Sequence, residues 1–185
     1  MELRTLAVTL ALAAGVRGGQ VDKGPVQELT VCVAGDMAPQ VLPFAQGFAA
    51  RMFGDIGVRL SWSHRPATCE DRRQPAILIR FTGAPANGLS KNAFAYARPR
   101  EGTVVIVYTR LRWAERKPAL APRLLAHVLV HEIAHTLQRA ERHSATGIMK
   151  TEWTEADYDR MAFKPLEFEP QDILLIRSGL AARSR

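Results

Sequence analysis

The feature that most constrains the fold is a set of polar side chains inside an otherwise apolar helical segment. Residues 122–138 open with a proline and carry leucine, isoleucine and alanine at helical spacing, which predicts a buried helix. His131 and His135 lie four residues apart and so share one side of that helix, with Glu132 beside the first. Polar groups are costly to bury unless they are paired, so these side chains require a partner. Their types and spacing predict a catalytic site for a divalent metal.

Two other histidines fall outside this expected site. His127 lies on the same predicted helix, eight residues before His135. Eight helical residues span about 12 Å, whereas each ligand nitrogen lies about 2 Å from its ion, so one metal cannot bind both side chains. We therefore expect His127 in the core or packed beside the ligands. His64 lies in a polar loop and is expected at the surface.

A third histidine, His143, follows the helix and is itself followed by a Thr-Gly-Ile-Met segment that ends at Met149. Together with the helical motif, these residues resemble the zincin metallopeptidases and, within them, the metzincins. In that family the helical HExxH motif continues to a third histidine and then to a methionine in a tight turn beneath the metal. The resemblance covers roughly residues 29–149 and implies Zn2+ as cofactor and Met149 in the supporting turn. The metal ligands that it implies are His131, His135 and His143.

The sequence departs from the family pattern in the segment after the helix. The third histidine of metzincins lies six residues after the second, a position that is Glu141 here, whereas His143 lies eight residues after it. The glycine that usually ends the helix is replaced by Gln138. Glu141 stays an alternative third ligand because two histidines and a carboxylate also form a known zinc set. We favour His143 because it directly precedes the candidate methionine turn.

The resemblance implies an enzyme that hydrolyses peptide bonds, with a peptide or protein as its substrate. Glu132 would act as general base toward a metal-activated water and then return the proton to the leaving amine. Tyr158 lies nine residues after Met149 and is a candidate for steadying the oxyanion, with packing as the simpler role. An edge strand near residues 94–97 would bind an extended peptide by strand addition. The alternative is a catalytically inactive relative that keeps the metal as a binding or interaction module.

The order of predicted elements indicates an α+β fold of the zincin type, with a mostly parallel sheet. A hairpin formed by residues 93–97 and 103–109 adds an antiparallel edge strand. After the metal-binding helix, Thr154 begins a capping box and Pro170 opens a last helix, giving a small helical subdomain. We expect one metallopeptidase-like domain over residues 21–185. The remaining predicted elements are strands 28–34, 58–63 and 76–81, and a helix from Pro43 to about Phe53.

The first 20 residues are typical of a signal peptide. One arginine precedes an apolar run of roughly a dozen residues, which is too short to span a bilayer as a helix. This predicts a secreted or periplasmic protein without a stable membrane anchor. In an oxidising compartment Cys32 and Cys69 could form a disulfide, and two separate buried thiols are the alternative.

The chain has a net charge of +7, which raises the question of an anionic partner. Its basic residues are scattered along the sequence, and no nucleic-acid-binding motif accompanies them. We therefore expect no nucleic-acid partner, and a generally cationic surface on a monomer.

Overall fold

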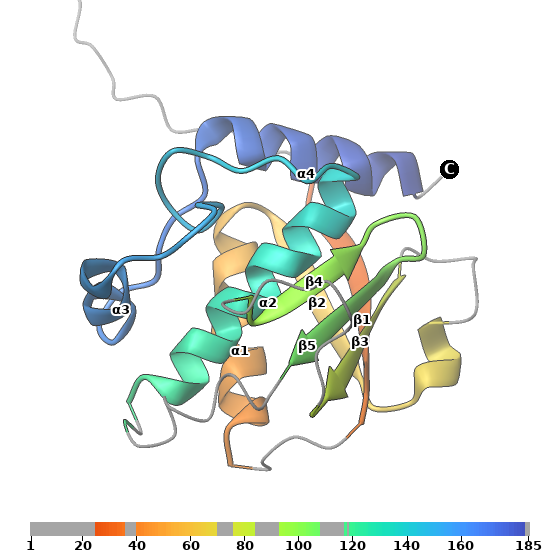
Figure 1. Cartoon of the computed structure of the whole chain (residues 1–185). Coiled ribbons are helices and arrows are strands. Elements are labelled where there is room, and N and C mark those ends of the chain that lie inside the picture. Colours follow the sequence, from red (N-terminus) through yellow and green to blue (C-terminus); the bar gives the residue numbers. More distant parts are fainter. Residues whose placement is uncertain are drawn as a thin grey trace, which may run out of the picture.

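The fold is built on a five-stranded sheet with helices packed beside it, as the computed structural model shows (Figure 1). The structure describes residues 25–35, 40–69, 76–83, 93–107, 117 and 119–183. The expected signal peptide lies outside these residues. The strands are β1 (Gln27–Ala34), β2 (Val58–Ser63), β3 (Ala76–Thr82), β4 (Ala95–Arg98) and β5 (Thr103–Val107). The helices are α1 (Leu42–Asp55), the 3-10 helix η1 (Pro66–Cys69), α2 (Ala121–Gln138), α3 (Glu155–Met161) and α4 (Pro170–Arg183).

The sheet has the strand order β2-β1-β3-β5-β4, and β4 alone runs antiparallel to its neighbour. The predicted α+β plan is therefore confirmed, including the antiparallel hairpin that places β4 at the edge. Side chains alternate between the two faces of a strand, so Leu29, Val31 and Val33 of β1 share one face and are all buried. Cys32 lies between them and points to the opposite face.

Helices α1 and α2 pack against each other and against the sheet (Figure 1). Leu125, Leu129 and Ile133 are completely or almost completely buried in α2, as the apolar spacing of the sequence predicts. The helix begins at Ala121 and ends at Gln138, within one residue of the predicted segment. No helix in the described part of the chain combines the length and apolar character that a membrane crossing requires.

Helix α4 crosses the C-terminal end of α2 (Figure 1). A Cβ on Gly179 would lie 1.8 Å from the carbonyl oxygen of Leu137, so only glycine permits this close approach. Arg183 Nη2 donates a hydrogen bond of 2.8 Å to the carbonyl oxygen of Thr136 in the last turn of α2. Helix α4 therefore packs on the end of α2 and also satisfies one of its free carbonyl groups.

The predicted element boundaries differ from the observed ones by up to two residues. Helix α1 extends to Asp55, two residues beyond the predicted end. Strand β4 begins at Ala95 rather than Ala93, and strand β5 ends at Val107 in the described part of the chain. The polar loop after β2 contains the short helix η1, which the sequence did not indicate. These shifts leave the predicted topology unchanged.

A disulfide between Cys32 and Cys69 joins β1 to η1, as one of the two sequence alternatives predicted. The two Cα atoms lie 6.0 Å apart, within the usual range for a disulfide. The bond closes a loop of 37 residues that includes α1 and β2. It therefore constrains the unfolded chain across the first part of the sheet.

We expect removal of this disulfide to lower the free energy of unfolding by about 3–4 kcal/mol, because the loop it closes is long. The measurement is urea denaturation of the oxidised protein, the reduced protein and a Cys32→Ala, Cys69→Ala variant. The reduced protein and the double variant should agree closely. Equal stability of the oxidised and reduced proteins would contradict the expectation.

Candidate metal centre

The polar residues of α2 lie near its C-terminal end and face a cleft beside β4. His131, Glu132 and His135 are 9%, 8% and 6% exposed, so the helix buries all three side chains almost completely. The cleft nevertheless reaches each of them. Burial without full enclosure is the environment in which a metal and a substrate could meet these groups.

Backbone carbonyl groups fix the tautomers of the two helical histidines. His131 Nδ1 lies 2.9 Å from the carbonyl oxygen of Ile148, and His135 Nδ1 lies 3.0 Å from that of Ala140. A carbonyl oxygen only accepts hydrogen bonds, so each Nδ1 carries the proton and donates. Burial lowers the pKa of His131 to about 3 and also lowers the pKa of His135, so both rings are neutral near pH 7. Both Nε2 atoms are therefore left with unprotonated lone pairs.

These two Nε2 atoms lie 2.9 Å apart, with their rings nearly perpendicular. Two lone pairs at that distance repel each other unless a positive charge lies between them. The tautomers thus define a point of negative potential close to both histidines, and a cation at this point would remove the repulsion.

His143 completes a group of three imidazoles around this point. One ring nitrogen from each of His131, His135 and His143 lies within 4.8 Å of the others, and the His143 ring is centred 4.8 Å from that of His135. Glu141, the alternative third ligand, lines the cleft but does not belong to this group. The described residues therefore bring together the predicted histidine set.

The group fits the coordination preference of zinc. Zinc binds imidazole nitrogens at about 2.0–2.1 Å in a tetrahedron, which separates neighbouring ligand nitrogens by about 3.4 Å. The spacings in the protein range from 2.9 Å between the helical nitrogens to a limit of 4.8 Å for the whole group. Small rotations of the rings would bring them to that value. Three nitrogen ligands would leave a fourth position open to water or substrate, as in catalytic sites.

The segment that carries His143 leaves the helix through a left-handed residue. Arg139, directly after Gln138, has a φ of +54° and ends α2. Glycine is the usual residue in this conformation, and the resemblance placed it one position earlier. The longer turn still returns His143 to the two helical histidines, so the departure from the family spacing does not exclude the three-histidine group.

The segment expected to form the methionine turn contacts His131 through the backbone of Ile148. Met149 is fully buried, and the carbonyl oxygen of Ile148 accepts hydrogen bonds from His131 Nδ1 and, at 3.2 Å, from Trp153 Nε1. The Ile148 amide in turn donates to the carbonyl oxygen of Glu167 at 2.9 Å. The turn thus fixes the orientation of one candidate ligand through its backbone.

Glu132 lines the same cleft as the histidines, and burial raises the pKa of its carboxyl group to about 8. The described residues place neither a cation nor a hydrogen-bond donor on this carboxylate. A carboxyl group whose pKa is raised in this way can gain or lose its proton near neutral pH, so Glu132, in a cleft beside convergent imidazoles, is a candidate for proton transfer.

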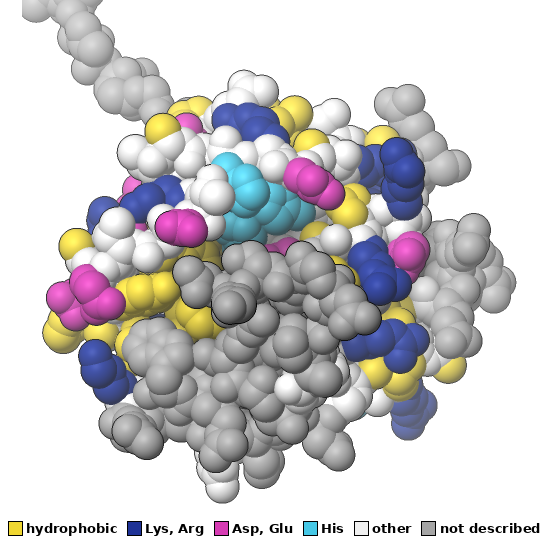
Figure 2. Space-filling view, viewed as in Figure 1, with side chains coloured by type: hydrophobic (Ala, Val, Ile, Leu, Met, Phe, Trp, Pro, Cys, Tyr) yellow, Lys and Arg dark blue, Asp and Glu magenta, His cyan; other side chains and the backbone are white. Residues whose placement is uncertain are grey.

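The cleft has a volume of about 770 Å³ and runs along the edge strand β4. Figure 2 shows the histidines at the centre of this face, with acidic side chains on either side. Tyr158 of α3 lines the cleft and is also half-buried against the core. Its position is therefore compatible with both roles considered for it, stabilising the oxyanion and packing. Burial raises the pKa of its hydroxyl group above the usual value. Lys150 lines the cleft as well and forms an ion pair with Asp157.

Trp153 has a role in the site that the sequence did not predict. Its side chain is partly buried and packs against the core. Its ring also lies edge-on to His131, with centroids 5.7 Å apart, and lines the cleft. The sequence carried no signal for this contact, because it depends on the turn at Ile148 that orients the indole.

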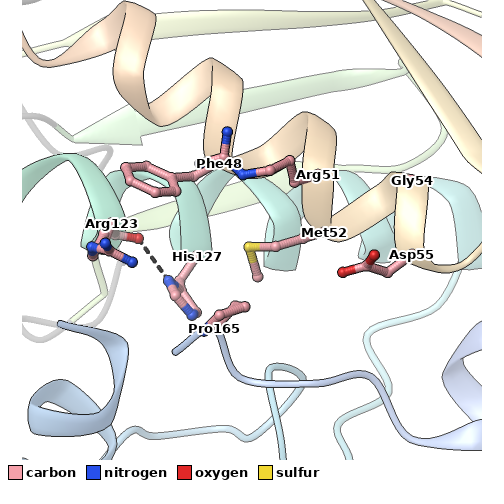
Figure 3. Close-up of a pocket in the computed structure, with 8 residues that line it drawn as sticks. All are labelled: Phe48, Arg51, Met52, Gly54, Asp55, Arg123, His127 and Pro165. Carbon is pink, nitrogen blue, oxygen red and sulfur yellow. Dashed lines mark hydrogen bonds between the residues drawn. The ribbon is translucent and has the colours of Figure 1, made fainter. Parts of the chain in front are cut away.

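His127 lies apart from the histidine group, as the helix geometry predicted. Its Nδ1 donates to the carbonyl oxygen of Arg123 at 2.6 Å (Figure 3). Its Nε2 accepts from the Leu166 amide at 3.0 Å. Both ring nitrogens are therefore used, and the ring lines a second pocket of about 590 Å³ beneath Phe48. His64 is exposed at the surface, as expected.

Solved structures that share this fold include two proteins of archaeal origin. Archaemetzincin from Methanopyrus kandleri matches with a TM-score of 0.55 and 18% identity, covering 87% of this chain and 99% of that chain. A zinc-dependent peptidase from Methanocorpusculum labreanum matches with a TM-score of 0.56 and 14% identity, covering 80% and 99%. No protein-family profile and no curated protein matches the sequence. At these identities the likeness establishes the fold, and this fold carries a three-histidine group that could bind zinc.

We expect the substitution Gly147→Ala to lower the free energy of unfolding by at least about 2 kcal/mol. Gly147 has a φ of +71°, and an added Cβ would lie 2.2 Å from the carbonyl oxygen of Glu167. The turn that presents Ile148 would have to shift. Urea denaturation measures the effect, with Gly54→Ala as control, because Gly54 lies within α1 and an added Cβ there has nothing within 4 Å. A Gly147→Ala variant with the same free energy of unfolding as the wild type would contradict the geometry of this turn.

The stability contributed by His127 should be lost in acid. Burial lowers its pKa to about 4 from 6.5, so the unfolded chain takes up a proton first as the pH falls. The contribution of His127 to the free energy of unfolding is therefore fully present above about pH 6.5. It falls by up to about 3 kcal/mol as the pH approaches 4. Protonation at Nε2 would also oppose the Leu166 amide that donates to it.

The measurement is the free energy of unfolding of the metal-free protein between pH 4 and pH 7, for the wild type and for His127→Gln. The variant should be less stable at neutral pH and should lose less stability in acid. His64→Gln is the control, because that side chain is exposed and should leave the slope unchanged. Parallel slopes for wild type and His127→Gln would contradict the prediction.

Proposed function

We propose that this protein is a zinc-dependent peptidase of the metzincin type, with His131, His135 and His143 as the metal ligands. The observation that carries the proposal is the pair of backbone carbonyl groups that accept hydrogen bonds from Nδ1 of both helical histidines, so that the Nε2 lone pairs of the two rings converge beside the buried Glu132 side chain. The zinc peptidase among the structural neighbours supports the choice of metal and reaction. Nitrogen ligands also favour zinc over calcium and magnesium.

The residues of the cleft divide the reaction between them. Zinc, when bound, would polarise the substrate carbonyl and lower the pKa of water at its open position. Glu132 would be the base that accepts a proton from the attacking water and returns it to the leaving amine. Its burial keeps competing solvent away from the carboxylate. Tyr158 lies in the same cleft and is assigned here to the oxyanion, which its hydroxyl group would stabilise by donating a hydrogen bond.

The substrate is an extended peptide that binds along β4. This strand ends the sheet, and residues 93–97 line the cleft together with the histidines. An edge strand has unpaired backbone groups that a peptide can satisfy by strand addition. The disulfide between Cys32 and Cys69 supports an exported location, because such bonds persist in oxidising compartments. We accordingly assign the first 20 residues to a signal peptide.

The decisive experiment compares the wild type with Glu132→Gln. The variant keeps the size of the side chain but cannot accept the proton, so hydrolysis of an unstructured protein should fall at least about 100-fold. Zinc stoichiometry, measured by metal analysis, should not change, because Glu132 is not among the proposed ligands. Glu152→Gln is the matched control, because Glu152 also lines the cleft and has no proposed part in the chemistry.

Full activity of Glu132→Gln would refute the assignment of the base. Stoichiometric zinc binding without cleavage by any form would instead favour the alternative function, a catalytically inactive binding or interaction module of the same fold. A wild type that binds no zinc would refute both functions.

A further inference from the structure

His143 is the least constrained side chain of the histidine group. It lies outside any helix or strand, and its side chain is exposed, whereas His131 and His135 are buried on α2. Carbonyl groups orient the two helical rings. In the described part of the chain no hydrogen bond fixes the His143 ring. Its position must therefore come from the segment that carries it.

The two neighbours of His143 in the sequence bind the same buried carboxylate. Ser144 Oγ donates to both oxygens of Asp172, at 2.8 Å each. Arg142 forms an ion pair with Asp172 Oδ1 and also donates to Ser144 Oγ at 3.2 Å. The residues before and after His143 are thus both tied to Asp172, while the His143 ring lies beside His135.

Asp172 is itself rigidly held. It lies in the first turn of α4 and is fully buried. Its Oδ2 accepts a hydrogen bond of 3.3 Å from the Glu169 amide, next to the helix start at Pro170. A buried carboxylate is costly unless cations and donors surround it, and both Arg142 and Ser144 meet that need. The same pairing therefore stabilises the charge and fixes the loop.

A second contact fixes the loop just beyond this point. Glu169 Oε1 accepts hydrogen bonds from the Thr146 amide at 2.9 Å and from Thr146 Oγ1 at 2.7 Å. The start of α4 and the residue before it thus hold the chain at three residues before the turn at Met149, namely Arg142, Ser144 and Thr146. The segment between His135 and His143 is two residues longer than the spacing of the metzincin family. A longer loop has more conformational freedom, so contacts that anchor it restrict it more.

We propose that Asp172 is a positioning residue for the metal centre, which holds His143 within reach of the ion through Arg142 and Ser144. This inference rests on the proposed function, because it takes the three histidines as ligands. Its physical basis is preorganisation: a ligand held in place before binding loses less conformational entropy when the metal arrives. None of the hydrogen bonds described above joins Asp172 directly to a proposed ligand.

The test is the zinc dissociation constant of the full protein, measured by competition with a chromophoric chelator. Asp172→Asn keeps the shape of the side chain but removes its charge, and we expect it to weaken zinc binding about 10- to 100-fold. Ser144→Ala keeps the Asp172–Arg142 ion pair and should weaken binding less. Circular dichroism selects conditions under which each variant is folded. If Asp172→Asn does not fold, then Ser144→Ala and Arg142→Gln decide the question.

Asp157→Asn is a matched control. Asp157 holds the equivalent first-turn position in α3, accepts a hydrogen bond of 2.8 Å from the Thr154 amide, and pairs with Lys150. It differs from Asp172 in that its partners do not flank a proposed ligand. Its loss should reduce stability and leave zinc affinity unchanged.

Wild-type affinity in folded Asp172→Asn and Ser144→Ala would overturn this inference alone. An equal loss of affinity in Asp157→Asn would also overturn it, because the effect would then follow from helix capping in general. A wild type that binds no zinc would overturn the proposed function, and this inference with it. Selective loss in the Asp172 and Ser144 variants supports it.

Discussion

The metal centre depends on two hydrogen bonds from imidazole to backbone. The carbonyl oxygens of Ile148 and Ala140 accept from Nδ1 of His131 and His135, which leaves both Nε2 lone pairs directed at one point. Helical spacing alone would place the rings on one side without fixing which nitrogen is free. The two carbonyl groups lie after the helix, so the helix supplies the candidate ligands and the following chain determines which ring nitrogen carries the proton.

Helix α4 is the element that connects this site to the rest of the fold. It packs on the end of α2 at Gly179. Asp172 in its first turn and Glu169, the residue before the helix, bind the loop that carries His143. Two histidines are thus built into a buried helix, whereas the third is held by a helix some 30 residues further along the chain. The C-terminal part of the protein therefore completes the site rather than only covering it.

The accuracy of the sequence predictions follows the range of the interactions involved. Apolar periodicity and proline gave α2 within one residue, and a capping box gave the start of α3 at Thr154. These signals are local, because each depends on neighbours within one or two helical turns. The role of Trp153 in the cleft and the contacts of Asp172 could not be predicted, because they join residues that are distant in the sequence or depend on a turn.

The sequence by itself determined that two histidines and a carboxyl group lie together on α2, because helical periodicity places residues four apart on one side. It also determined that His127 could not join them. It left open the choice between His143 and Glu141, and between a disulfide and two thiols. The tertiary structure joins Cys32 to Cys69, and it groups His143, and not Glu141, with the two helical histidines. Such choices depend on how a turn folds back and how strands align, and no local pattern encodes either.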